Sequence, residues 1–335
     1  ELFFFFFFSF FLSTNSRIMS ALRMMMWGSG MSRLCASPST VGVRYKTSAS
    51  QTAHIPHSEG SSVLLSFDHD DETGKDTGVA IIRFNRPEKL NALTVQVGED
   101  LRQTCQLLSK YPPDQLRCVV IAGDSHDHAF SAGGDLDFLR DRTKGDPLEN
   151  RQKMLEFYEY FLSPRKIGVP VLAAINGHAI GAGACLAVSC DLRPAIAPTA
   201  KIGFNFTKIG LHPGLGSTHF LAKAVGTHTA SKLLLTGQLL KAKKAQEIGL
   251  ADKVCTEPEE VLPETLRIAR QIAENSPVAV RAYIQTMRTK EEGALRSALL
   301  DEANGQSISY GEEDMIEGLK FARDHKAVPA FSWRK

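Results

Sequence analysis

The sequence predicts an α/β fold followed by a helical C-terminal segment. Residues 79–84 and 118–122 are apolar runs of strand length, and residues 95–109 between them carry apolar side chains at helical spacing. A strand, a helix and a second strand at this spacing form a right-handed crossover unit. From residue 259 to about residue 323 the pattern is helical, with a break expected near Pro277.

Further along, residues 199–204 indicate another strand, and residues 229–249 indicate helices broken at Gly237. Residues 50–76 are mostly polar and acidic, so we expect a linker and an exposed hairpin tip. We divide the chain into three parts. They are a leader or targeting segment (1–58), a core domain (59–257) and a C-terminal helical domain (258–335).

The leader has two compositions. Residues 2–12 are LFFFFFFSFFL, an apolar run that is too short to span a bilayer and is either a translated upstream region or a targeting signal. Residues 19–58 contain arginines and many serines but no Asp or Glu, which is typical of a mitochondrial presequence. We therefore expect the mitochondrial matrix, and an unstructured tail is the alternative.

Charge and cysteine content exclude some classes of function. The 335 residues carry a net charge of +2, which argues against a nucleic-acid-binding surface. No cysteine spacing suggests a metal site, and several cysteines lie in apolar runs, so free thiols in a reducing compartment are expected. The six are Cys35, Cys105, Cys118, Cys185, Cys190 and Cys255.

Two glycine-rich segments carry the chemical signal. In residues 170–191 (PVLAAINGHAIGAGACLAVSCD) a buried apolar strand leads into a glycine-rich turn that opens a helix, and residues 129–139 (AFSAGGDLDFL) follow an apolar strand in the same way. Such turns leave backbone N–H groups unpaired. Two converging N–H donors suit a reaction at a thioester carbonyl, because they stabilise the developing oxyanion.

Six motifs in order make the chain similar to the crotonase superfamily, which contains the enoyl-CoA hydratases and isomerases. Besides the two glycine-rich segments, they are RFNRPEKLNALT (83–94), KIGFNFTKIGLHPGLGSTHFLAKAVG (201–226), LLLTGQLLKAKKAQEIGLADKV (233–254) and GEEDMIEGLKFARDHKAVPAF (311–331). The resemblance implies a spiral of ββα units with a C-terminal helical trimerisation domain. It also implies an acyl-CoA thioester as substrate, no cofactor besides coenzyme A, and a homotrimer or a hexamer built as a dimer of trimers.

The same resemblance assigns the binding residues. The oxyanion amides fall on Gly134 and Ala182, with Asp135 holding the first turn. Residues 86–93 would lie along the CoA moiety, and Lys320 and Lys326 could reach a ribose phosphate. The residues expected to bind CoA are Lys89, Ala92, Ser131, Ala132, Asp135 and Phe206.

The sequence departs from the family at the acid/base positions. Typical hydratases use two glutamates with one water between them. In family register these positions hold Cys185 and Phe206, neither of which is a carboxylate. Hydration by a glutamate pair is therefore not expected.

Several side chains could replace the pair. Cys185 in the first turn of a helix would have a lowered pKa and act as nucleophile, although a packed apolar cysteine is the simpler interpretation. His212, with Asp135 or Asp137 as partner, is the best acid/base candidate, because histidine titrates near neutrality. Weaker candidates are His178 and His219, and Asn205 and Thr207 could only orient a water.

Three classes of function remain. The first is an enzyme of the enoyl-CoA hydratase or isomerase type in fatty-acid or branched-chain acyl-CoA breakdown, working with substitute residues. The second is other crotonase chemistry, such as acyl-CoA thioester hydrolysis or decarboxylation. The third is a non-catalytic acyl-CoA-binding protein that keeps the fold.

Overall fold

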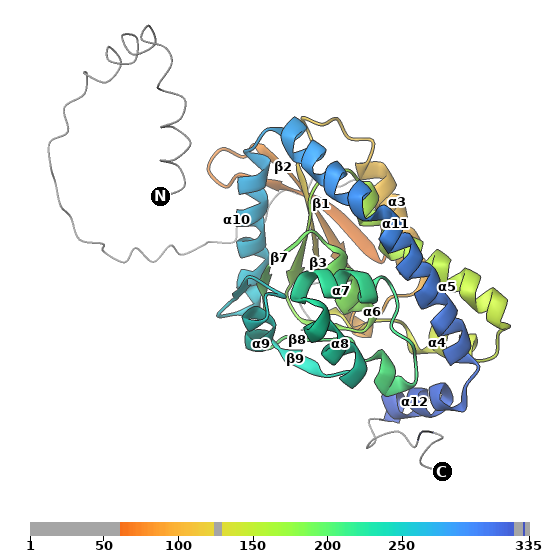
Figure 1. Ribbon diagram of the computed structural model, residues 1–335. Coiled ribbons are helices and arrows are strands. Elements are labelled where there is room, and N and C mark those ends of the chain that lie inside the picture. Colours follow the sequence, from red (N-terminus) through yellow and green to blue (C-terminus); the bar gives the residue numbers. More distant parts are fainter. Residues whose placement is uncertain (1–60, 124–128, 325–330, 332–335) are drawn as a thin grey trace, which may run out of the picture. The chain divides into compact units, whose positions relative to one another are not determined.

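The computed structural model describes residues 61–123, 129–324 and 331, and this part of the chain builds two β-sheets surrounded by helices (Figure 1). The first sheet has the strand order β1-β2-β3-β5-β7-β10. Its strands are β1 (Val63–His69), β2 (Asp76–Phe84), β3 (Cys118–Ala122), β5 (Val171–Ile175), β7 (Leu192–Ile196) and β10 (Lys253–Val254). The second sheet is β4 (Ala129–Ser131), β6 (His178–Ile180), β8 (Lys201–Gly203) and β9 (Leu239–Lys241).

From β3 to β8, consecutive strands alternate between the two sheets. Strands β3, β5 and β7 are parallel neighbours in the first sheet, whereas β4, β6 and β8, which follow them in the chain, are parallel neighbours in the second. Each repeat of two strands and their helix is therefore one turn of a spiral. This arrangement confirms the predicted α/β fold built from ββα units.

The central strands are buried on both faces. Every residue of β3 (CVVIA) and of β5 (VLAAI) is buried, as a continuous apolar run predicts for an internal strand of a parallel sheet. The expected helix between β2 and β3 is α3 (Val95–Leu108), which begins where the Thr94 hydroxyl accepts a hydrogen bond from the Val97 amide. The predicted crossover is thus confirmed.

The remaining helices follow in chain order. The α-helices are α4 (Leu136–Arg142), α5 (Pro147–Phe161), α6 (Ala182–Ser189), α7 (Ser217–Val225), α8 (Thr227–Thr236), α9 (Ala242–Glu247), α10 (Val261–Ala273), α11 (Pro277–Tyr310) and α12 (Glu313–Asp324). Short 3₁₀ helices are η1 (Pro87–Lys89), η2 (Ser163–Lys166), η3 (Phe206–Ile209) and η4 (Pro258–Glu260).

The C-terminal helices have different neighbours. Helix α10 packs on β2, β3, β5 and β7, whereas the long α11 runs beside α5, and α12 contacts η3 and α4 (Figure 1). The predicted break is confirmed, because Pro277 is the first residue of α11 and Ser276 caps it. A second break, between α11 and α12, was not predicted.

Two short strands differ from the sequence prediction. Strand β1 forms where the sequence predicted a linker, because its residues pair with β2 in spite of the acidic residues nearby. The predicted exposed hairpin tip is the turn at residues 70–75. Strand β9 lies in a segment expected to be helical, because it pairs with β8 beyond the predicted break at Gly237.

The leader predicted for residues 1–58 lies outside the described residues. Within the described ranges, no helix has both the length and the apolar character needed to cross a bilayer.

Candidate active site

The first glycine-rich turn joins β4 to α4 and leaves one amide free. Leu93 donates its N–H to the Gly133 oxygen (2.8 Å) and accepts the N–H of Asp135 (3.1 Å). The Gly134 amide between these two bonds has no hydrogen-bond acceptor among the residues that the structure describes. As predicted, Asp135 holds the turn, because its carboxylate accepts the N–H groups of Asp137 and Phe138, both at 3.0 Å.

The second turn joins β6 to α6 and also leaves an amide free. Gly181 has φ +52°, in the left-handed region that favours glycine. No side chain caps the helix, and Ala182 is its first residue. The N–H of Ala182 is therefore one of the first-turn donors that have no acceptor within the helix.

The two turns pack directly against each other, because β4 and β6 are parallel neighbours. A Cβ on Gly133 would lie 2.5 Å from the Ile180 oxygen and 3.4 Å from the Ala182 nitrogen. A Cβ on Gly183 would lie 2.5 Å from the Ser131 oxygen. The glycines thus allow a backbone contact that brings two free amides to the same end of the second sheet.

The segment expected to lie along CoA is tied to the first turn. The Ala132 amide donates to the Leu90 oxygen (2.9 Å), and the Ser131 hydroxyl donates to the Asn91 oxygen (2.8 Å). Leu90 and Asn91 both have positive φ, at 49° and 52°, which folds this segment tightly. The structure therefore joins residues 86–93 to Ser131 and Ala132, two other residues expected to bind CoA.

The individual CoA candidates differ in exposure. Lys89 and Ala132 are exposed, Ala92 and Asp135 are half-buried, and Ser131 is buried. Phe206 is buried in η3 (7 % exposed). Lys320 is exposed and bonds Glu317 at 2.8 Å, whereas Lys326 lies outside the described residues.

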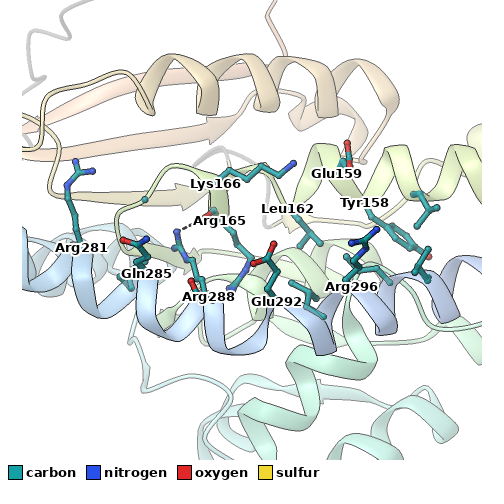
Figure 2. Close-up of a pocket in the computed structure, with 17 residues that line it drawn as sticks. Tyr158, Glu159, Leu162, Arg165, Lys166, Arg281, Gln285, Arg288, Glu292 and Arg296 are labelled. Atoms are coloured by element: carbon teal, nitrogen blue, oxygen red, sulfur yellow. Dashed lines mark hydrogen bonds between the residues drawn. The ribbon is translucent and has the colours of Figure 1, made fainter.

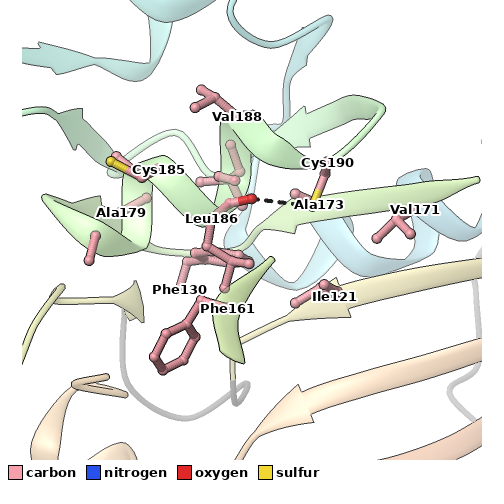
Figure 3. Packing of buried hydrophobic residues seen from close by; sticks show 14 of the residues in the cluster. Ile121, Phe130, Phe161, Val171, Ala173, Ala179, Cys185, Leu186, Val188 and Cys190 are labelled. Carbon is pink, nitrogen blue, oxygen red and sulfur yellow. Dashed lines mark hydrogen bonds between the residues drawn. The ribbon is translucent and has the colours of Figure 1, made fainter. Parts of the chain in front are cut away.

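The structure corrects the prediction for Cys185. Its side chain is fully buried among apolar residues, as Figure 3 shows, and burial raises its pKa well above the usual thiol value. The N-terminal end of α6 would favour a thiolate at Cys185, but the loss of solvation on burial is the larger effect and favours the neutral thiol. The packed, apolar interpretation of this cysteine is the one that its surroundings support.

His212 lies against helix α11 and lacks the predicted partner. Its Nδ1 is 2.6 Å from the Pro213 oxygen, and a Cβ on Gly305 would lie 2.6 Å from the ring. Among the described residues it makes no hydrogen bond to Asp135, which caps α4, or to Asp137, which pairs with Arg140 at 2.9 Å. The predicted His–Asp pair is therefore not formed.

The other polar candidates are also engaged. His178 accepts the Lys201 amide through Nδ1 (3.2 Å), and His219 lies 3.5 Å from Glu291. Asn205 is closer to the turns, because its Oδ1 is 3.6 Å from where a Cβ on Gly181 would be. The Thr207 hydroxyl instead donates to the Leu234 oxygen (3.0 Å).

A groove with a volume of about 930 Å³ lies between α5 and α11 (Figure 2). Leu162 and Ile284 line it together with Arg165, Arg288 and Arg296, and none of the predicted site residues do. The guanidinium of Arg288 is bound to Asp191 (2.9 Å) and to backbone oxygens. This groove is thus separate from the two turns.

Sequence reasoning missed one buried acidic residue near the site, Glu302 in α11. Its carboxylate accepts the N–H groups of Gly216 (2.6 Å) and Thr218 (2.8 Å), and burial raises its pKa. The available signal was a polar stripe at helical spacing, formed by Glu302, Gln306 and Ser309. Within the described ranges no cluster of side chains could hold a metal ion.

Comparison with known proteins identifies the family. The family described as "Enoyl-CoA hydratase/isomerase" matches residues 74–327. The short-chain-enoyl-CoA hydratase of Clostridium acetobutylicum is 30% identical over 260 residues, covering 78% of this chain and 97% of that protein. The crotonyl-CoA hydratase of Syntrophomonas wolfei is 32% identical over 245 residues, covering 73% and 91%.

Solved structures agree with this match. An enoyl-CoA hydratase/isomerase from Pseudoalteromonas atlantica superposes with a TM-score of 0.67 at 26% identity, covering 81% of this chain and all of that one. The chain belongs to the enoyl-CoA hydratase/isomerase family of the crotonase superfamily.

Proposed function

We propose that this enzyme binds an acyl-CoA thioester with its carbonyl oxygen between the amides of Gly134 and Ala182, and that it stabilises the enolate formed there. The observation that carries the proposal is the direct packing of two strand-to-helix turns, each with a free N–H, at the same end of one sheet. Preorganised donors of this kind stabilise charge that develops in the transition state.

Helix α6 strengthens this arrangement. It begins at Ala182 and is buried along all eight residues. The partial positive charge at its N-terminus would act on the enolate oxygen with little screening by water. The CoA moiety would lie along residues 86–93 and Ser131–Ala132, with Lys89 free to approach the phosphates.

Proton transfer would fall to His212. Because a carbonyl oxygen can only accept, the contact with Pro213 places the proton on Nδ1. The Nε2 lone pair is then available, and it has no hydrogen-bond partner among the described residues. We assign the role of general acid/base to this nitrogen.

A second candidate function is thioester hydrolysis or decarboxylation. The observation that favours it is the absence of a carboxylate at residues 185 and 206, where a hydratase would hold its two glutamates. Both reactions use the same pair of amides, since each passes through an oxyanion or an enolate.

The assembly and location are proposed on separate grounds. Helix α11 exposes several large apolar side chains, among them Val278 (75 % exposed), Tyr283 (62 %) and Ile308 (66 %). Such apolar residues would be covered in a homotrimer, or in a hexamer made of two trimers. The composition of residues 19–58 supports the mitochondrial matrix, and coenzyme A as part of the substrate is the only cofactor proposed.

Turnover of a thioester panel tests the function. The purified protein would be assayed with enoyl-CoA, β-keto-acyl-CoA, branched acyl-CoA and carboxyacyl-CoA thioesters such as malonyl-CoA. Water addition, double-bond migration, CoA release and CO₂ release would be followed separately. Water addition or isomerisation supports the first candidate, and CoA or CO₂ release supports the second. Binding without any turnover would refute both and leave a non-catalytic acyl-CoA-binding protein.

A further inference from the structure

Helix α11 holds the loop at residues 212–218 through three side chains on one face. Ser309 accepts the His212 amide (3.1 Å), and Gln306 donates to the His212 oxygen (2.9 Å). Glu302 accepts the amides of Gly216 and Thr218 and also the Thr218 hydroxyl (2.6 Å). The loop is therefore fixed from its first residue to the start of α7.

The loop needs this support because its backbone is unusual. Leu215 has φ +58° and Gly216 has φ +74°, so two successive residues are left-handed. A leucine in this region is strained and persists only where the surroundings hold it. Leu215 is buried (1 % exposed), and the Glu302 carboxylate bonds the amides immediately after it.

Helix and loop approach so closely that only glycine fits. A Cβ on Gly214 would lie 2.5 Å from both the Tyr158 hydroxyl and the Gln306 amide. Tyr158 of α5 donates to Gln306 (2.8 Å), so α5 is joined to the same network. Little room is left for the loop to move while these bonds hold.

Helix α7 transmits the position of the loop to α6. The two helices pack together, and Ser217 at the start of α7 and Cys185 in α6 are both fully buried. The N-terminus of α6 has no side-chain cap. The packing of α7 therefore helps to set the position of the Ala182 amide.

We propose that Glu302 is a positioning residue, which fixes the 212–218 loop and helix α7 and thereby holds the Ala182 amide and His212 in place. This inference rests on the oxyanion role proposed above for Ala182. Glu302 itself is buried (1 % exposed), and its carboxylate is bonded to the backbone of residues 216 and 218 and to the Thr218 hydroxyl.

The test compares Glu302→Gln with Asp301→Asn in the full chain. Glutamine places an NH₂ group where Glu302 accepts a backbone N–H, so one amide loses its acceptor. Asp301 is the neighbouring, exposed carboxylate on the same helix and serves as the matched control. Thr218→Val, which removes only the hydroxyl donor, is the milder variant in case Glu302→Gln does not fold.

Amide hydrogen exchange without ligand gives the first measurement. We expect exchange about tenfold faster in the 212–218 loop and in the hydrogen-bonded amides of α6, which begin at Cys185, in Glu302→Gln, with α3 unchanged. Thr218→Val should change the same amides less. Unchanged exchange in α6, or an equal effect of Asp301→Asn, would overturn the inference.

Binding of cinnamoyl-CoA gives the second measurement. Donors on the thioester oxygen polarise this chromophore and shift its absorption to longer wavelength. We expect the shift in the wild-type protein to shrink in Glu302→Gln while the Kd changes less than about threefold, because the CoA contacts lie elsewhere. An undiminished shift would overturn the inference. A wild-type complex without a shift would refute the proposed oxyanion role, and hydrogen exchange would still decide whether Glu302 positions α6.

Discussion

Two regions of the candidate site differ in the groups that they offer for chemistry. The turns after β4 and β6 offer backbone amides, whereas residues 185 and 206, where a hydratase would hold its glutamates, offer only their side chains. The turns keep the features that the family fold requires, with glycines where a Cβ would meet the neighbouring backbone. Residues 185 and 206 are a thiol and a phenyl ring, both buried. Substituting one side chain can remove a general acid or base without disturbing the backbone. Substituting a glycine of the turns would disturb the backbone and the free amides together, because a Cβ there meets the neighbouring backbone. The comparison explains how a chain can keep one half of a site and lose the other.

Hydration of crotonyl-CoA separates the two regions most clearly, because it would use the backbone amides of the turns and also needs a general acid and base at residues 185 and 206. We expect the wild-type protein to be at least about 10² slower than the Clostridium acetobutylicum relative, because residues 185 and 206 are not carboxylates and cannot act as a glutamate pair. Adding them as Cys185→Glu with Phe206→Glu should raise the hydration rate by at least about tenfold. The matched control is the neutral pair Cys185→Gln with Phe206→Gln. Fast hydration by the unmodified protein would show that other residues supply the proton transfer.

Removing one backbone donor tests the half of the site that is kept. Proline fits the first position of a helix, so Ala182→Pro removes the N–H with limited disturbance of α6. Loss of a preorganised donor should lower kcat on the true substrate about 10² to 10³ fold. Ala182→Ser, which keeps the amide, should remain close to wild type. A folded Ala182→Pro protein with unchanged kcat would exclude this amide from the mechanism.

His212→Gln tests whether a histidine replaces the missing carboxylates. We expect the rate to fall at least about tenfold, with CoA affinity nearly unchanged. The structure places His219 beside Glu291, so His228, which is exposed on α8, is the better control. Equal losses in His212→Gln and His228→Gln would assign His212 to structure.

The buried carboxylate also predicts a pH dependence of stability. Because burial raises the pKa of Glu302 above 4.5, the folded protein keeps this proton at pH values where the unfolded chain has lost it. Stability from this group is therefore present below pH 4.5 and decreases as pH rises through the folded pKa. We expect Glu302→Gln to lack this component. Urea unfolding of both proteins from pH 4 to 8 measures it, and parallel curves would contradict the assignment.

The smallest effect is expected at Cys185. A packed thiol with a raised pKa is a poor nucleophile, so Cys185→Ala should change kcat by less than about twofold. The lost contacts should lower the free energy of unfolding by about 1 kcal/mol. A rate loss in excess of tenfold, measured on a folded variant, would restore the nucleophile hypothesis.

The sequence was sufficient for the repeated units and the two turns, because both depend on local patterns. Apolar runs such as 118–122 predict buried strands, and the glycines around 133 and 181 predict tight strand-to-helix connections. It was not sufficient for β9, which forms only by pairing with β8. For Cys185 the apolar residues around it in the sequence favoured a packed thiol, which the structure shows, but the contact of α6 with α7 comes from another part of the chain and was not predicted. The role of Glu302 was missed for the same reason, because its partners are 84 and 86 residues away.

The position of α11 and α12 after both sheets in the chain has a consequence for biosynthesis. Strands β1 to β10 leave the ribosome first, and they contain both turns with their glycines. The groups that hold the 212–218 loop, and the helix α12 that contacts η3 and α4, emerge only afterwards. A nascent chain can therefore form its sheets before the 212–218 loop is supported, and ordering of this loop coincides with the docking of the last two helices.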